Sequence, residues 1–383
     1  MSSTLALRAG PDALAILRER GLRAEDVDVV PGASGGPKWL VLAGLDRFFF
    51  GELFAAPRTR PLHLIGSSIG SWRLACLAQG DPLAALARAH EAYIEQRYTP
   101  KPQLDEVTRV GAEILDVLLG ASGVDEILTH PWARLHVVTS ELRGLGATDR
   151  RWPLLASLAI AAAGNLLSRR VLARRVWRVI FHTARDDSPF RGLSDFPTLH
   201  FPLTRENTRA ALLASASIPL LLSGVAIPGA AGLYRDGGIV DYHLDVDFGA
   251  GDGIVLYPHF YPHVVPGWFD KSLSWRRARV DNFRRALIIA PSDDFVAALP
   301  GASAPTIALM HALESSGDAH EALRAGRTYE ARIRTFLETD PAAEVLAETR
   351  RLRAIEGPAA APANGAVVPP QSGRPTVGKR SGY

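Results

Sequence analysis

Two segments in the first 80 residues each combine a short apolar strand, a glycine-rich turn and an apolar helix. In the first, Val27–Val30 runs into the turn Gly32–Lys38, and an apolar helical pattern follows. In the second, Leu62–Ile65 runs into Gly66–Gly70, and another helical pattern follows. Strand–turn–helix units in succession are typical of a parallel sheet with helical crossovers. This repeated order therefore predicts an α/β fold.

The rest of the chain continues the same mixture of strands and helices. Further strands are predicted at Leu135–Thr139, Val176–His182, Gly253–Tyr257 and Ala286–Ala290. Helices are predicted at Asp12–Arg20, Trp39–Phe50, Pro82–Arg97, Leu104–Leu119 and Arg205–Ala214. Residues 293–356 are mostly helical by pattern, whereas residues 357–383 are rich in Pro, Ala, Gly and Ser and predict a disordered tail. We expect one domain over residues 1–356, with its motifs at about 27–257.

The charge balance and the cysteine count exclude several classes of protein. The formal net charge is +3, and three positive charges lie in the last ten residues, so the body is about neutral. A nucleic-acid partner is not expected, because proteins that neutralise phosphates usually carry a larger basic excess. The single cysteine, Cys76, excludes an intrachain disulfide and a Cys-rich zinc site. We expect a cytoplasmic protein, since the first residues also lack the apolar run of a signal peptide.

Two uncharged stretches, Trp152–Ser168 and Ala210–Tyr234, could be mistaken for membrane-spanning segments. The second contains Pro219 and Pro228, which break a helix, so a buried core segment is predicted there. The first leads into a basic run that contains Arg169, Arg170, Arg174, Arg175 and Arg178. One interpretation is a core helix followed by a solvated helix with its arginines on one exposed face. The other is a peripheral contact with an anionic membrane through residues 152–178.

The turn at Gly66–Gly70 fits the pattern G-x-S-x-G, with Ser68 as the central serine. A hydrophobic strand precedes it and a helix follows, which is the setting of a nucleophile elbow. There the hydroxyl lies at a helix N-terminus, where the dipole favours developing negative charge. The alternative is an ordinary strand–helix turn with a serine cap.

The earlier turn at Gly32–Lys38 predicts an oxyanion hole. Trp39 follows the lysine where a phosphate-binding P-loop has Ser or Thr, and the spacing of a dinucleotide fingerprint is absent. Gly35 and Gly36 can instead present bare N–H groups to a substrate carbonyl. The alternative is a tight turn without a function. A third element, Asp236-Gly237-Gly238, could hold a carboxylate in an open turn, although taken alone it is a common turn sequence.

Taken together and in this order, the three motifs resemble those of the patatin-like phospholipase family. The similarity is densest over Ser34–Leu45 and over Leu213–Gly238, and it extends over roughly Val27–Tyr257. The sequence departs from the family pattern at Ser34, where a glycine is usual, and at Trp39, where a small residue is usual.

The resemblance implies a three-layer patatin-like fold with a mostly parallel central sheet flanked by helices and a helical C-terminal portion. It implies hydrolysis of lipid acyl esters without a metal or cofactor. Ser68 would be the nucleophile and Asp236 its base, and Gly35 and Gly36 would form the oxyanion hole. Lys38 would contact the loop or an anionic head group.

Two alternatives remain open on the sequence alone. A Ser–His–Asp esterase would use a histidine that follows the aspartate, and His243, His259 and His263 all do. A non-catalytic lipid- or protein-binding protein would result if the bulky Trp39 blocked the pocket.

Overall fold

The computed structural model of the chain describes residues 5–99, 102–183 and 188–298. Within them, one nine-stranded sheet has the order β1-β9-β8-β2-β3-β4-β5-β6, and β7 pairs with β4 away from this path. The strands are β1 (Leu5–Ala9), β2 (Val27–Gly32), β3 (Leu62–Ser67), β4 (Ala133–Leu142), β5 (Val176–His182), β6 (Thr198–Pro202), β7 (Tyr234–Asp236), β8 (Ile254–Pro258) and β9 (Ala286–Pro291).

The sheet is mostly parallel, as the sequence predicts. Five of its eight strand pairings are parallel, and the antiparallel ones join β1 to β9, β4 to β5 and β4 to β7. Every residue of β2, β3 and β8 is buried. Strands whose two faces are both covered by other elements are rich in apolar residues. This explains why these strands could be recognised in the sequence.

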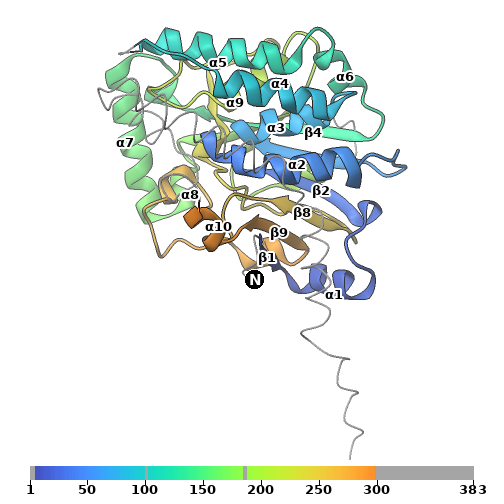
Figure 1. Ribbon diagram of the computed structural model, residues 1–383. Helices are drawn as coiled ribbons and strands as arrows, with labels where there is room; N and C mark the ends of the chain where they lie inside the picture. Colours follow the sequence, from blue (N-terminus) through green and yellow to red (C-terminus); the bar gives the residue numbers. More distant parts are fainter. Residues whose placement is uncertain (1–4, 100–101, 184–187, 299–383) are drawn as a thin grey trace, which may run out of the picture.

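Helices cover the sheet in layers (Figure 1). Helices α3 and α9 pack on the central strands, and α4 and α5 lie over α3. The α-helices are α1 (Pro11–Arg20), α2 (Ala43–Phe48), α3 (Ile69–Leu77), α4 (Pro82–Ile94), α5 (Leu104–Leu119), α6 (Gly123–Thr129), α7 (Arg151–Leu167), α8 (Arg169–Leu172), α9 (Thr208–Ser215) and α10 (Asp293–Ala298). Among the short helices, η2 (Gly36–Leu42), η3 (Phe49–Leu53), η6 (Gly237–Ile239) and η7 (Trp268–Asp270) matter for the site.

Several local predictions need correction. Three strands, β1, β6 and β7, were not predicted. The single helix predicted over residues 39–50 is instead a 3₁₀ segment (η2), the short α2 and a π-helical turn (η3). The buried core segment predicted over residues 210–234 is correct in part, because α9, Leu222, Ile227 and Tyr234 are buried whereas Leu220 is 41% exposed.

The division into a domain over residues 1–356 and a tail stays a prediction. Most of the helical C-terminal portion predicted at 293–356, and all of the tail at 357–383, lie outside the described residues. Only the short α10 at the start of that portion is described.

The register of β4 brings two distant segments together. Strand β3 ends where Ser67 pairs with Val138, and the antiparallel β7 ends where Asp236 pairs with Thr139. The carboxyl ends of β3 and β7 therefore meet at neighbouring positions of the same strand. The residue that follows β3 is Ser68, so strand pairing alone places it beside Asp236.

Candidate active site

Ser68 occupies a strained turn between β3 and α3. Its φ of 57° and ψ of −131° lie in a region that residues with side chains rarely adopt. The flanking glycines allow this turn to close. A Cβ on Gly66 would lie 2.6 Å from the Cα of Ser71, and a Cβ on Gly70 would lie 2.1 Å from the carbonyl oxygen of Gly32. The first and last positions of the G-x-S-x-G pattern are thus glycine for steric reasons.

The Ser68 hydroxyl donates a hydrogen bond of 2.6 Å to Oδ2 of Asp236. Both residues are buried, with exposed fractions of 4% and 5%. The other carboxylate oxygen, Oδ1, accepts 2.7 Å from the N–H of Gly238 and 3.5 Å from the hydroxyl of Ser34. Ser34, one of the two departures from the family pattern, therefore contacts the carboxylate through a hydroxyl that glycine would lack.

Burial raises the pKa of Asp236 to about 6. The hydrogen bonds from Ser68 and Gly238 and the positive charge of Lys271 act in the opposite direction and limit this rise. A carboxylate of this pKa is a better proton acceptor than an exposed one, yet it is still mostly ionised at neutral pH.

Ser215 holds the turn against the sheet. Its hydroxyl accepts 2.9 Å from the N–H of Ser68 and donates 2.6 Å to the carbonyl of Val138, and it lies 2.8 Å from the hydroxyl of Ser71. Helix α9 is thus tied to both β4 and the start of α3. Sequence reasoning missed this role, although Ser215 lies in one of the two segments with the densest family similarity.

The glycine turn after β2 faces the same serine. Gly35 has no room for a side chain, because a Cβ would lie 2.5 Å from the ring of Phe260. Within the described part of the chain, no group accepts a hydrogen bond from the N–H of Gly35 or Gly36. Lys38 donates 3.5 Å to the carbonyl of Gly35, which is the loop contact that the sequence predicted as one option.

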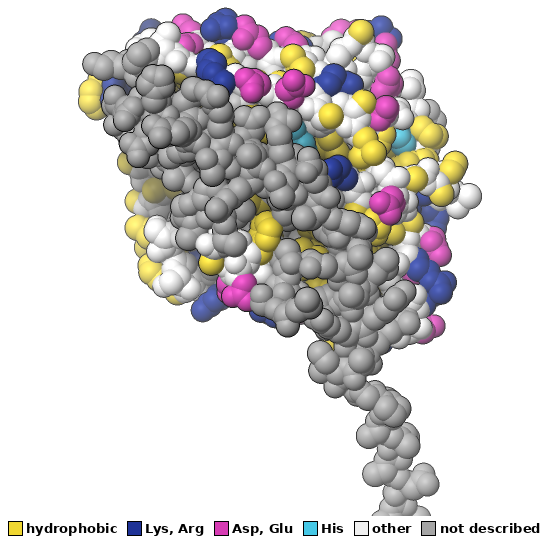
Figure 2. All heavy atoms as spheres, viewed as in Figure 1, with side chains coloured by type: hydrophobic (Ala, Val, Ile, Leu, Met, Phe, Trp, Pro, Cys, Tyr) yellow, Lys and Arg dark blue, Asp and Glu magenta, His cyan; other side chains and the backbone are white. Residues whose placement is uncertain are grey.

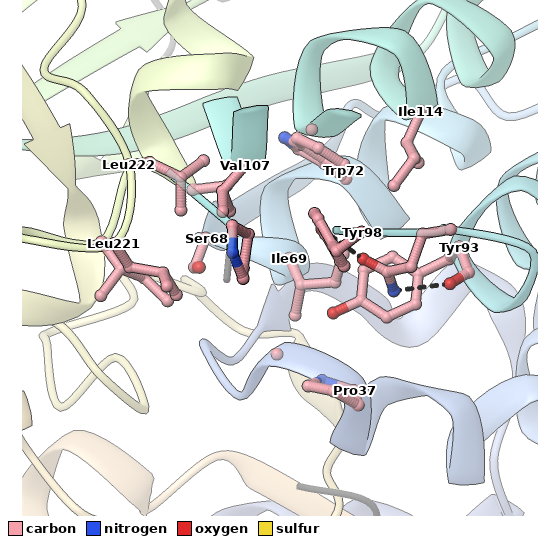
Figure 3. Close-up of a pocket in the computed structure, with 16 residues that line it drawn as sticks. Pro37, Ser68, Ile69, Trp72, Tyr93, Tyr98, Val107, Ile114, Leu221 and Leu222 are labelled. Carbon is pink, nitrogen blue, oxygen red and sulfur yellow. Dashed lines mark hydrogen bonds between the residues drawn. The ribbon is translucent and has the colours of Figure 1, made fainter. Parts of the chain in front are cut away.

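Two cavities meet at Ser68. The first, which we call the apolar pocket, has a volume of about 140 Å³, and Figure 3 shows Trp72, Val107 and Leu222 around the serine. Its lining comprises Gly36, Pro37, Ser68, Ile69, Trp72, Tyr93, Gln96, Tyr98, Pro102, Val107, Gly111, Ile114, Ala216, Ile218, Leu221 and Leu222.

The second cavity, which we call the cationic pocket, has a volume of about 210 Å³. It contains the side chains of Lys38 and Lys271 together with Asp236. Its lining comprises Ser34, Gly35, Gly36, Lys38, Ser68, Ile218, Pro219, Asp236, Gly238, Ile239, Tyr242, Trp268 and Lys271. Sequence reasoning missed Lys271, which no motif marks.

Trp39 and the three candidate histidines line neither cavity. The Trp39 side chain is 2% exposed and packs edge-on against Tyr93, a pocket residue, at 5.7 Å between ring centroids. His243 accepts a hydrogen bond at Nδ1 from the N–H of Val265, and burial lowers its pKa well below the usual value.

Some arginines of the basic run after α7 are exposed and others are buried. Arg170, Arg174 and Arg175 are exposed. Arg178 is fully buried and pairs with Asp241 at 2.6 Å and with Asp195 at 2.7 Å. Arg169 pairs with Asp270 at 2.9 Å. The prediction that all five arginines share one exposed face is therefore wrong, because two of them hold acidic groups of neighbouring segments.

Helix α7 exposes an apolar face. After Arg151 at its first position, its exposed residues are all apolar, and Trp152 and Leu167 are 77% and 80% exposed. The face comprises Trp152, Ala156, Ala159, Ile160, Ala163, Leu166 and Leu167. Hydrophobic side chains line the corresponding edge in Figure 2. No helix among the described residues is long and apolar enough to cross a membrane, and no His, Cys, Asp or Glu cluster there could hold a metal ion.

Fold and turn geometry define an α/β protein with a buried serine at a strand–helix elbow. The sequence model of the family described as "Patatin-like phospholipase" matches residues 40–243, more than half of the chain. The chain belongs to the patatin-like phospholipase family, which implies a lipid acyl hydrolase acting on a lipid substrate. The match includes Ser68 and Asp236, and it begins just after the Gly35–Lys38 turn. Comparison with the curated proteins and with the solved structures gave no match.

Proposed function

We propose that the protein hydrolyses lipid acyl esters with a Ser68–Asp236 dyad. The observation that carries the proposal is the 2.6 Å hydrogen bond between the two side chains at the point where an apolar pocket begins. The apolar pocket suits an acyl chain, and the strained turn exposes Oγ of Ser68 to a carbonyl carbon at its entrance.

In the first step, Oγ of Ser68 forms a bond to the ester carbonyl carbon while Asp236 takes the hydroxyl proton. The tetrahedral intermediate then loses the alcohol, which receives that proton from Asp236, and an acyl-serine remains. Water attacks the acyl-serine with the same carboxylate as its base, and the fatty acid leaves as Ser68 regains its proton. The raised pKa of Asp236 suits both directions of this transfer.

The N–H groups of Gly35 and Gly36 would hold the oxyanion of each tetrahedral intermediate. Both residues line the cationic pocket beside Ser68, and neither amide has an acceptor among the described residues. Loss of one such donor typically reduces the rate by about 10²–10³-fold.

The geometry favours the dyad over both alternatives. A triad needs a histidine within hydrogen-bond reach of the serine, whereas the acceptor of the Ser68 proton is Asp236. In a non-catalytic protein the Trp39 ring would block the apolar pocket. In this structure the ring packs against Tyr93 and does not line that pocket. The location in the cytoplasm remains a prediction.

A fluorophosphonate probe tests the nucleophile directly. We expect it to label one serine of the purified protein, and peptide mapping should place the label on Ser68. Ser68→Ala should remove the label, while Ser71→Ala should retain it, because Ser71 supports the turn without facing the substrate. A folded protein without label, or with label on another serine, would contradict the proposal.

We also propose that the apolar face of α7 rests on an anionic membrane. Exposed arginines flank this face at both ends, Arg150 and Arg151 before it and Arg170, Arg174 and Arg175 after it. Apolar side chains that enter the lipid, together with flanking cations that meet its head groups, are typical of interfacial helices. Such a contact would bring a water-insoluble substrate to the protein.

Vesicle flotation tests this contact. Wild-type protein should float with vesicles of phosphatidylcholine and phosphatidylglycerol and less with phosphatidylcholine alone. The double variant Trp152→Ser/Leu167→Ser should lose about tenfold or more in binding, since each large apolar side chain contributes appreciably on burial. The matched control is Val117→Ser, which removes an exposed apolar side chain of α5. Equal binding of all three proteins would remove the membrane proposal without affecting the dyad.

A further inference from the structure

The two cavities that meet at Ser68 have few lining residues in common. Among the described residues, Gly36, Ser68 and Ile218 line both the apolar pocket and the cationic pocket. Gly36 has no side chain, and the small hydroxyl of Ser68 is the candidate nucleophile. Ile218 is therefore the one residue with a bulky side chain at the junction of the two cavities.

The segment that carries Ile218 also positions both members of the dyad. The hydroxyl of Ser215 accepts 2.9 Å from the N–H of Ser68, and the carbonyl of Ser217 accepts 3.0 Å from the N–H of Asp236. The hydroxyl of Ser217 donates 2.9 Å back to a carbonyl of α9. Ile218 follows directly, so hydrogen bonds fix its place relative to both the nucleophile and the base.

Ile218 has little freedom to move aside. Its side chain branches at Cβ, which restricts rotation about χ1. Pro219 follows it, and a proline ring restricts the backbone of the preceding residue. The carbonyl of Ile218 also accepts 3.1 Å and 2.9 Å from the N–H groups of Leu221 and Leu222, which closes a turn. A rigid group at the junction restricts the shape of what can pass it.

A bound ester has to extend across this junction. Its carbonyl carbon reacts at Oγ of Ser68, so the acyl chain and the alcohol portion leave the reacting group in different directions. The two carbons that flank the ester group then lie beside Ile218. An unbranched chain is narrow at these carbons, whereas a branch adds a methyl group there. A shaped pocket typically discriminates about 10–200-fold on one such group.

We infer that Ile218 is a specificity-determining residue that selects esters without a branch at either carbon next to the ester group. Such esters join linear acyl chains to primary alcohols. The inference rests on the proposed hydrolysis at Ser68. It adds a selection by shape, which does not depend on the head group of the lipid.

Three short, dissolved esters test this selection. 1-Propyl hexanoate has no branch, 2-propyl hexanoate has one on the alcohol carbon, and 1-propyl 2-methylhexanoate has one on the acyl carbon. The wild-type kcat/KM should favour the first ester over both others. Ile218→Ala should reduce both preferences about tenfold relative to the wild type, because the bulk at the junction is lost. Comparison of variant with wild type cancels the intrinsic difference in reactivity between the esters.

Two further variants complete this test. Ile218→Val removes one methyl group and should reduce the preferences by a smaller factor, so it keeps the test available if the alanine variant does not fold. Leu220→Ala is the matched control in the same segment, because Leu220 is 41% exposed and lines neither cavity. It should leave both the rate and the preferences unchanged. If the Ile218 variants change kcat/KM for all three esters by the same factor, Ile218 only supports the packing of the elbow, and the inference is overturned.

Binding separates the inference from the proposed hydrolysis. Ser68→Ala can be titrated with the three esters and followed by tryptophan fluorescence, since Trp72 lines the apolar pocket. The unbranched ester should bind more tightly than the other two, and Ser68→Ala/Ile218→Ala should lose this difference. Such binding together with a wild type that hydrolyses none of the esters would uphold the selection and refute the hydrolysis. Equal binding of the three esters to Ser68→Ala would overturn the inference.

Discussion

The two cavities that meet at Ser68 differ in the charge and polarity of the side chains that line them. The apolar pocket is walled by helices α3 and α5 and by the chain after α9, and its walls are largely aliphatic and aromatic. The cationic pocket is walled mainly by turns and contains Asp236 with two lysines. The side that would take an acyl chain is thus apolar, whereas the side with the chemistry is charged. The difference indicates that chain-length preference and catalysis can be altered separately.

The largest effect should come from a change that damages both cavities together. In Gly70→Ala the added Cβ would meet the backbone of Gly32, which cannot move without displacing β2. We expect destabilisation of about 3 kcal/mol or more, seen as a fall in Tm of about 10 °C or as loss of soluble protein. Gly192→Ala is the control, because nothing lies within 4 Å of that Cβ position. Equal melting of the two variants would show that the elbow is not closely packed.

A change confined to the apolar pocket should alter selectivity without altering catalysis. Gly111→Leu adds a side chain from α5 into this cavity, near Leu222. The kcat/KM for a long-chain ester should fall by about 10–50-fold, since each excluded methylene loses about 0.8 kcal/mol of burial. The kcat/KM for an acetyl ester should stay nearly unchanged. Gly111→Ala is the matched control, because its Cβ would make only ordinary contact with Leu222 at 3.5 Å. A uniform loss for all chain lengths would place the acyl chain elsewhere.

Much of this arrangement could be predicted from the sequence. The buried strands β2, β3, β4, β5, β8 and β9 could be predicted, because each contains a short cluster of apolar residues. By contrast, β1 and β6 lie at the two edges of the sheet, and β7 has only three residues. Their pairing depends on neighbours that are distant in the sequence, so no local pattern indicates them.

The residues of the candidate site also differ in how well the sequence predicts them. Ser68, Asp236 and the candidate oxyanion-hole glycines Gly35 and Gly36 belong to short motifs, so they could be proposed in advance. Lys271 and Ser215 take their positions from tertiary packing, and no motif marks them. The scarcity of lysine was the one signal that could have drawn attention to Lys271. The burial of Arg178 against Asp241 was unpredictable for the same reason, because its partner is 63 residues away.

The burial of Asp236 in the cationic pocket should also lower the free energy of unfolding by a measurable amount. The folded pKa of Asp236 is raised from 3.8 to about 6, so the native state binds more protons than the unfolded state between these pH values. Stability is therefore lost as pH rises through this window. Asp236→Asn should stabilise the fold relative to wild type by up to about 3 kcal/mol at pH 8, from the shift at ~1.4 kcal/mol per pH unit. The gain should vanish near pH 4. Urea unfolding at both pH values measures it, and a gain independent of pH would reject the buried carboxylate as its cause.

The smallest expected effect is a shift in the pH dependence of activity, caused by the charge of Lys271 near Asp236. Activity should fall as pH drops through about 6, because protonated Asp236 cannot accept the serine proton. The charge of Lys271 lowers the pKa of Asp236, so Lys271→Gln should move this acidic limb to higher pH. The pH profile of kcat/KM on a neutral short-chain ester measures the shift, with Arg277→Gln as control. A limb that stays in place in Lys271→Gln would show that the two groups are not coupled.

The most direct test of the dyad is a double-mutant cycle on turnover of a soluble ester. Ser68→Ala and Asp236→Asn should each lower kcat/KM by about 10³-fold or more, and the double variant should be little worse than either, because residues that act as one unit are strongly non-additive. Folded variants His243→Gln, His259→Gln and His263→Gln should keep most of the activity. A folded histidine variant as inactive as Ser68→Ala, with substantial turnover left in Asp236→Asn, would contradict the account.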